Sequence, residues 1–130
     1  MPEEVARAIG EIADASLRDF SSVANEMLSE AVKMWRCPGI IFAEGTSGRR
    51  ARIPGTGLDV WEVIATHKSL AQDFERLRHA YHWLSDLQLR AALGYYAAYP
   101  EEVEGQIARN EVWTREWLAK QYPTLTPDQR

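Results

Sequence analysis

Apolar positions in the first 36 residues recur at helical spacing in two runs. The first run is Val5, Ile9 and Ile12, and the second is Val23, Met27, Leu28, Ala31, Val32 and Trp35. Residues 18–22 form a polar break in which Ser21 or Ser22 is the expected N-cap. The pattern predicts a helical hairpin over residues 1–36. So short a hairpin cannot bury its apolar stripe alone and needs either the rest of the chain or a second copy of itself. We expect a dimer formed through Val23, Met27 and Ala31.

The pattern changes after Cys37-Pro38-Gly39, which ends the helix. Residues 40–43 and 50–54 are typical of two short strands, and residues 44–48 form a glycine-containing loop between them. We therefore predict a small β-hairpin.

Three capping signatures follow: Asp59-x-x-Glu62, Ser69-x-x-Gln72 and Ser85-x-x-Gln88. They predict helices over about 60–67, 70–82 and 86–99, joined by short turns. This is the outline of a tri-helical, helix-turn-helix-like unit, and with the β-hairpin it forms a predicted domain over 37–100. Pro100 precedes a last predicted helix over about 101–121, in a C-terminal segment 101–130 that we expect to bind a partner. The predicted fold is mainly α with a small β-hairpin.

Composition narrows the class of protein. The chain is 45% apolar and 26% charged, which is typical of a globular protein. Its 130 residues are too few for a large catalytic scaffold. One cysteine cannot form an internal disulfide, and no apolar run approaches a membrane span. The acidic start, Met1-Pro2-Glu3-Glu4, is unlike the basic start of a signal peptide. We expect a cytoplasmic protein that does not contact a membrane.

The net charge of -4 does not favour a surface dominated by nucleic-acid binding. Its distribution changes that picture: residues 1–36 carry a net -3, residues 37–72 a net +1 and residues 101–130 a net -2. The central positive charge includes Arg49, Arg50 and Arg52. The acidic ends suit a segment that docks onto a basic partner.

Candidate reaction chemistry is sparse. Glu75, His79 and His82 could offer one helix face to a metal, but their aromatic neighbours and the lack of a strong metal motif favour packing. Cys37 reads better as a helix-ending residue than as a nucleophile, and Gly55-Thr56-Gly57 lacks the rest of a phosphate loop. We predict no metal, no cofactor and no enzymatic activity.

Two groups of residues are candidate DNA contacts. Arg49, Arg50 and Arg52 on a rigid hairpin could hold phosphates, although charge on a strand edge also protects against aggregation. Gln88 and Arg90 lie near the start of a helix, where a recognition helix places its base contacts, although most such helices only pack.

Trp113 and Trp117 are spaced four residues apart on the last predicted helix. We expect them to anchor a protein partner, because exposed aromatic side chains dominate interfaces. The alternative is packing against the N-terminal hairpin.

Residues 38–107 resemble the family catalogued as domain-of-unknown-function family 433. The resembling features are the strand pair, Ile53-Pro54-Gly55-Thr56-Gly57-Leu58-Asp59-Val60, Tyr81, Leu84-Ser85, Leu89, Ala91-Ala92-Leu93, Tyr95-Tyr96 and Pro100-Glu101-Glu102. Members usually carry Gly-Thr-Arg where this chain has Gly55-Thr56-Gly57, and Arg52 is the candidate substitute for that arginine.

Residues 2–36, from Pro2-Glu3-Glu4-Val5 to Trp35-Arg36, resemble the two helices of a ribbon-helix-helix repressor. In that family a strand before Pro-Glu-Glu enters the major groove as half of a dimer's β-ribbon. This chain starts at the end of such a strand, so we expect either an upstream start or a copy that keeps only the dimerisation helices.

Together the two resemblances imply an antitoxin that forms a homodimer, represses its own operon by binding operator DNA, and neutralises a toxin of the PIN-like nuclease class. The alternative expectation is an adaptor or structural subunit that never binds DNA.

Overall fold

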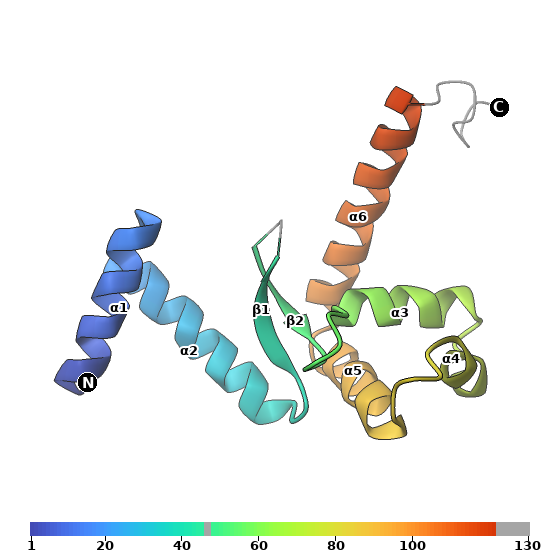
Figure 1. Ribbon diagram of the computed structural model, residues 1–130, viewed down its shortest axis with the longest axis horizontal. Helices are drawn as coiled ribbons and strands as arrows, with labels where there is room; N and C mark the ends of the chain where they lie inside the picture. Colours follow the sequence, from blue (N-terminus) through green and yellow to red (C-terminus); the bar gives the residue numbers. More distant parts are fainter. Residues whose placement is uncertain (46–47, 122–130) are drawn as a thin grey trace. The chain divides into compact units, whose positions relative to one another are not determined.

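The computed structural model describes residues 1–45 and 48–121, although it leaves out the side chains of residues 112–118 and 121. It confirms a mainly helical fold with a small antiparallel β-hairpin. The chain divides into two compact units, Met1–Pro38 and Gly39–Arg130 (Figure 1). None of the described helices is long and apolar enough to cross a membrane.

The first unit is the predicted helical hairpin, made of α1 (Glu3–Ser16) and α2 (Phe20–Arg36). Leu17 ends α1 in a left-handed conformation, with φ of 57°. The N-cap of α2 is Asp19, whose carboxylate accepts a hydrogen bond of 2.8 Å from the backbone N–H of Ser22. The prediction that Ser21 or Ser22 caps this helix was therefore wrong, because both serines already lie in its first turn.

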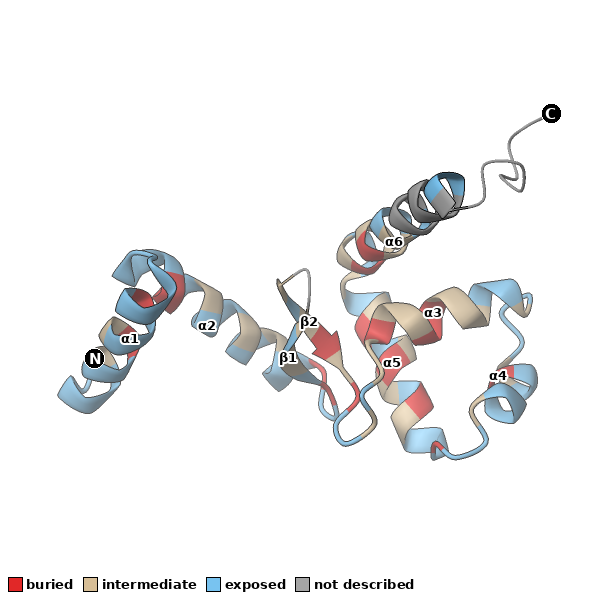
Figure 2. Ribbon diagram, turned by 45° about the horizontal axis from the view of Figure 1, so that its top comes forward, coloured by how far each residue is buried: buried red, intermediate tan, exposed pale blue. Residues whose placement is uncertain are grey.

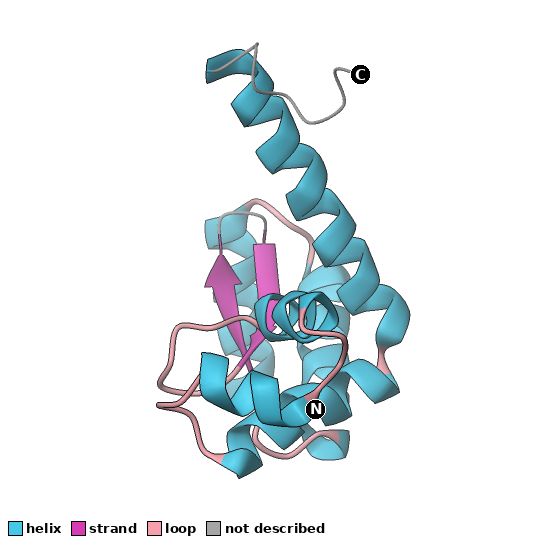
Figure 3. Cartoon of the chain, turned by 90° about the vertical axis from the view of Figure 1, so that its right-hand side faces the viewer, coloured by secondary structure: helices cyan, strands magenta, loops and turns pink. Residues whose placement is uncertain are grey.

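The second unit begins with the β-hairpin, formed by β1 (Ile41–Gly45) and β2 (Gly48–Arg52). Ile41 lies opposite Arg52, and the pairing runs to Gly45 opposite Gly48 (Figure 3). The strands therefore extend into the segment predicted as a loop. Arg52 also forms a bridge with Asp59, which connects the hairpin to the first residue of the helical part.

Three helices follow: α3 (Val60–Ser69), α4 (Phe74–Ala80) and α5 (Asp86–Ala98). The capping boxes at Asp59 and Ser85 are confirmed. The predicted helix start at Ser69 was wrong: the Ser69 hydroxyl donates to the carbonyl of Thr66, and α4 begins instead after Asp73. The physical reason is that Ala71 and Gln72 both have φ of 58°, a left-handed conformation that separates α3 from α4.

The core of the second unit lies among α3, α4, α5 and the start of α6 (Pro100–Gln121). Its fully buried side chains include Ile53, Val60, Val63, Ile64, Leu77, Leu89, Tyr95 and Val103. Figure 2 shows these buried positions on the facing sides of α3, α5 and α6, whereas the other positions of α3 are mostly intermediate and those of α4 mostly exposed. Leu84 and Leu89 are both buried on either side of the Ser85 cap, as expected for a hydrophobic staple.

Candidate functional surfaces

An open apolar groove runs between α1 and α2. It has a volume of about 610 Å³ and is lined by Met1, Glu4, Val5, Ala8, Ile9, Ile12, Ala24, Met27, Leu28 and Ala31. The residues predicted for dimerisation divide between two places. Met27 and Ala31 line the groove, whereas Val23 is 1% exposed and belongs to the hairpin's own core.

Exposed apolar side chains are concentrated in this first unit. Of the thirteen large apolar side chains exposed in the described part of the chain, ten lie between Met1 and Trp35. The hairpin's own core consists of only Ile9, Ala13, Val23 and Ala24. The first unit therefore exposes much apolar surface beside a small core.

The three arginines of the β-hairpin differ in their surroundings. Arg52 forms an ion pair of 3.0 Å with the carboxylate of Asp59, and Arg49 donates to the carbonyl of Phe42 and lies 3.7 Å from Glu44. Arg50 has no ion-pair partner among the described residues. Arg52 is therefore placed to hold the hairpin against the start of α3.

The two candidate contacts on α5 both have local roles. The side chain of Gln88 accepts a hydrogen bond of 2.8 Å from the backbone N–H of Ser85, which completes the capping box. The Arg90 guanidinium lies 4.6 Å from the centroid of the Phe74 ring, in a cation–π contact that joins α5 to α4.

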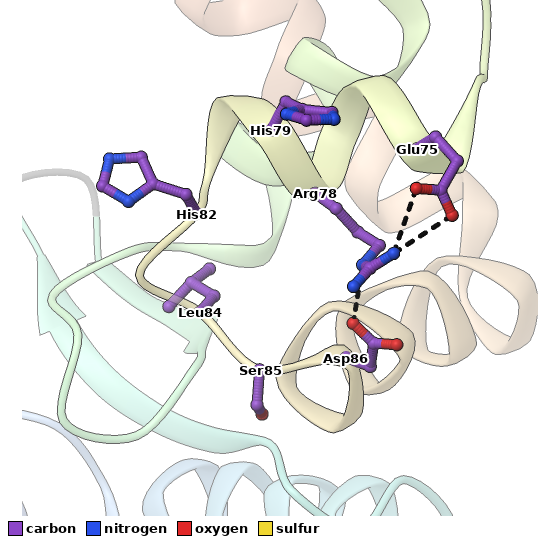
Figure 4. Close-up of a pocket in the computed structure, with 7 residues that line it drawn as sticks. All are labelled: Glu75, Arg78, His79, His82, Leu84, Ser85 and Asp86. Atoms are coloured by element: carbon purple, nitrogen blue, oxygen red, sulfur yellow. Dashed lines mark hydrogen bonds and ion pairs between the residues drawn. The ribbon is translucent and has the colours of Figure 1, made fainter.

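A pocket of about 330 Å³ lies at the corner between α4 and α5. Arg78 occupies its centre, where it pairs with Glu75 at 3.0 Å and with Asp86 at 2.9 Å (Figure 4). The two neighbouring carboxylates raise the pKa of Arg78, chiefly through the hydrogen bond that Arg78 donates to Glu75. The pairing neutralises much of the charge at this corner.

The histidines at that corner do not converge. In Figure 4 the imidazoles of His79 and His82 lie apart, and His82 points away from the carboxylates of Glu75 and Asp86. Across the described residues, no group of three His, Cys, Asp or Glu side chains is arranged to hold a metal ion. The helical spacing of Glu75, His79 and His82 thus does not bring three ligands together.

A polar network that the sequence did not predict joins α3, α5 and α6. The carboxylate of Glu104 accepts hydrogen bonds from Lys68 and from the hydroxyl of Tyr96, and the Lys68 ammonium lies 5.6 Å from the centroid of the Tyr96 ring. Lys68 and Glu104 are 36 positions apart. No local motif signals such a pair, because only the packing of α3 against α6 brings it together.

Trp113 and Trp117 fall on α6, but their side chains lie outside the described residues. Their predicted role as partner anchors stays a prediction.

Comparisons with known proteins add no relative. No family model matches the chain, and neither the curated proteins nor the solved structures contain a match.

Proposed function

We propose that this chain is an antitoxin-like regulator: it self-associates through α1 and α2, binds DNA through its second unit, and neutralises a partner toxin of the PIN-like nuclease class. The observation that supports the proposal most is the apolar groove of the first unit. Regulators of this kind need a self-association surface, because a two-fold dimer presents two copies of each DNA contact at a fixed spacing.

The apolar lining of the groove suits contact with a second copy of the same hairpin better than exposure to water. The only charged residue lining the groove is Glu4, and Val5, Ile12, Met27 and Leu28 are each at least 37% exposed. Two such hairpins packed face to face would bury these side chains in a four-helix arrangement, which hides the exposed apolar area of both copies.

Sedimentation of two matched variants tests self-association. Leu28, in the groove, and Leu17, outside its lining, are 61% and 94% exposed, so neither should be needed for folding of one chain. Leu28→Asp should weaken the dimer by about 2 kcal/mol or more, roughly thirtyfold in Kd, because it buries a charge in an apolar contact. Leu17→Asp should leave the dimer intact. A wild-type chain that is monomeric at micromolar concentration would overturn the self-association.

DNA binding is tested at Arg50. If this arginine contacts phosphate, Arg50→Ala should reduce the slope of log affinity against log salt by about 0.9 in magnitude, measured by fluorescence anisotropy on duplex DNA. Arg76→Ala, which removes an exposed arginine of α4, is the control for a loss of charge elsewhere. An unchanged slope in the Arg50 variant would remove the β-hairpin from the DNA surface.

A second candidate function is an adaptor that self-associates without binding DNA. It is favoured by the intramolecular partners of Arg49, Arg52, Gln88 and Arg90, which occupy four of the five predicted DNA contacts. The two candidates differ in the same anisotropy experiment. The adaptor predicts no salt-dependent association of the wild-type chain with duplex DNA.

A further inference from the structure

A cavity between α3 and α6 includes none of the individual residues that the sequence analysis named as contacts, although four of its lining residues fall in the segment 101–130. It has a volume of about 340 Å³ and is lined by Trp61, Ala65, Lys68, Glu104, Ile107, Asn110 and Glu111. Its size is within the range of sites that take a small ligand or one side chain of a partner.

One part of the lining is apolar and fixed in place. Trp61, Ala65 and Ile107 supply that part. The Trp61 indole N–H donates a hydrogen bond of 3.2 Å to the carboxylate of Asp59, and this carboxylate is itself paired with Arg52. The indole is therefore held before any ligand arrives, which reduces the entropy lost on binding.

The other part of the lining is polar and favours a cation. Among the described residues of the lining, Lys68 is the only basic one, and it is already paired with Glu104. Glu111 is exposed at the same cavity and Asn110 adds an amide, so the described lining carries one more negative charge than positive. An anion would have to displace Glu104 from Lys68 and would also meet Glu111, whereas a cation meets a carboxylate beside an aromatic ring.

We propose that this cavity binds the guanidinium group of an arginine side chain from a basic protein partner. A guanidinium combines a flat face that packs on an indole with N–H donors for Glu111 and Asn110, and it is more weakly hydrated than an ammonium ion. That the guanidinium comes from a protein rests on the partner-binding part of the proposed function. The charge and shape of the cavity do not depend on it.

The test is an NMR titration of the full chain with N-acetyl-arginine amide. Saturable shifts are expected for the Trp61 indole N–H and for the amides of Ile107 and Asn110, with the indole signal assigned from Trp61→Phe. Glu111→Gln should weaken binding by about two- to fivefold, the range that one exposed ion pair supplies. Glu101→Gln, an exposed acid of the same helix outside the cavity lining, should not change the affinity.

Other probes separate the alternatives. N-acetyl-citrulline amide has nearly the same shape without the charge, and binding of equal strength would overturn the role assigned to the cation. Inorganic phosphate that shifts the same signals would show a site for anions at Lys68 and would also overturn the proposal, as would the absence of saturable shifts with the arginine probe. None of these failures would touch self-association or DNA binding, which depend on other surfaces.

Discussion

Glu104 is the residue that connects the most elements of the second unit. It lies on α6 and accepts hydrogen bonds from Lys68 of α3 and Tyr96 of α5. The hydrogen bond from Lys68 lowers the pKa of Glu104 below its ordinary value of 4.5, with a further contribution from Tyr96. The same contact raises the pKa of Lys68. Both shifts favour the charged pair in the folded protein.

The lowered pKa of Glu104 predicts a specific dependence of stability on pH. A carboxyl group with a lower pKa in the folded state stabilises the fold above its unfolded pKa, and this contribution is lost as the pH falls through the folded value. The affected window therefore lies below about pH 4.5. Glu104→Gln should lower the urea midpoint at pH 7 and flatten the acid dependence in that window.

The control for this prediction is Glu101→Gln, which changes an exposed acid on the same helix. It should keep the acid dependence of the wild-type protein. Parallel acid limbs for the wild-type chain and Glu104→Gln would mean that the network adds nothing to stability, as is common for exposed ion pairs.

Residue-level chemistry also decides which sequence signals succeed. Ser85 and Gln88 form their predicted capping box, in which each side chain accepts a hydrogen bond from a backbone N–H at the start of α5. Ser69 and Gln72 have the same spacing, but the left-handed conformations of Ala71 and Gln72 end α3 there. A left-handed alanine is unfavourable by itself, and neither residue is of a type that signals this conformation, so a local pattern does not predict the end of α3.

At the scale of elements, the starts of α3 and α4 in the second unit depend on different contacts. Asp73 caps α4 through one hydrogen bond of 3.2 Å to the backbone N–H of Arg76. Asp59 begins α3 within a capping box, pairs with Arg52 and accepts from the Trp61 indole. One carboxylate thus joins the β-hairpin, the helix start and a cavity wall.

This difference predicts unequal costs for the same substitution. Asp73→Ala removes a cap and should cost about 1 kcal/mol in urea unfolding. Asp59→Ala also removes a partly buried ion pair and the acceptor of the indole N–H, so its cost should be about 2 kcal/mol or more. Equal costs would show that the contacts of Asp59 with Arg52 and Trp61 contribute nothing beyond the cap.

The elements were far more predictable than the sites they build. Helical spacing placed α1, α2, α5 and α6 closely, because amphipathic periodicity and capping are local properties. The pairs Arg52–Asp59 and Lys68–Glu104 depend on how elements pack. For the same reason, the sequence offered Arg52 and Gln88 as DNA contacts, whereas the folded chain gives each an internal partner.

At the scale of the whole molecule, the two units differ in the size of the buried core that stabilises each of them. The second unit buries a core of large side chains drawn from all four of its helices and from Ile40 and Ile53, which flank the β-hairpin. The first unit buries Ile9, Ala13, Val23, Ala24 and Cys37, and a two-helix unit with so small a core is not expected to persist alone. Its stability must then depend on what covers the groove.

If a second copy covers the groove, thermal unfolding of the first unit becomes a bimolecular property. Its melting temperature should rise with protein concentration, because mass action favours the folded dimer, whereas the transition of the second unit should not move. Calorimetry over a hundredfold concentration range should separate the two transitions.

Two variants assign the transitions. Leu28→Asp should abolish the concentration dependence, since it acts on the groove. Val63→Ala should lower only the transition of the second unit, because Val63 is fully buried there. A single transition independent of concentration would mean that neither unit relies on a second copy, and the apolar groove would then have to serve a different partner.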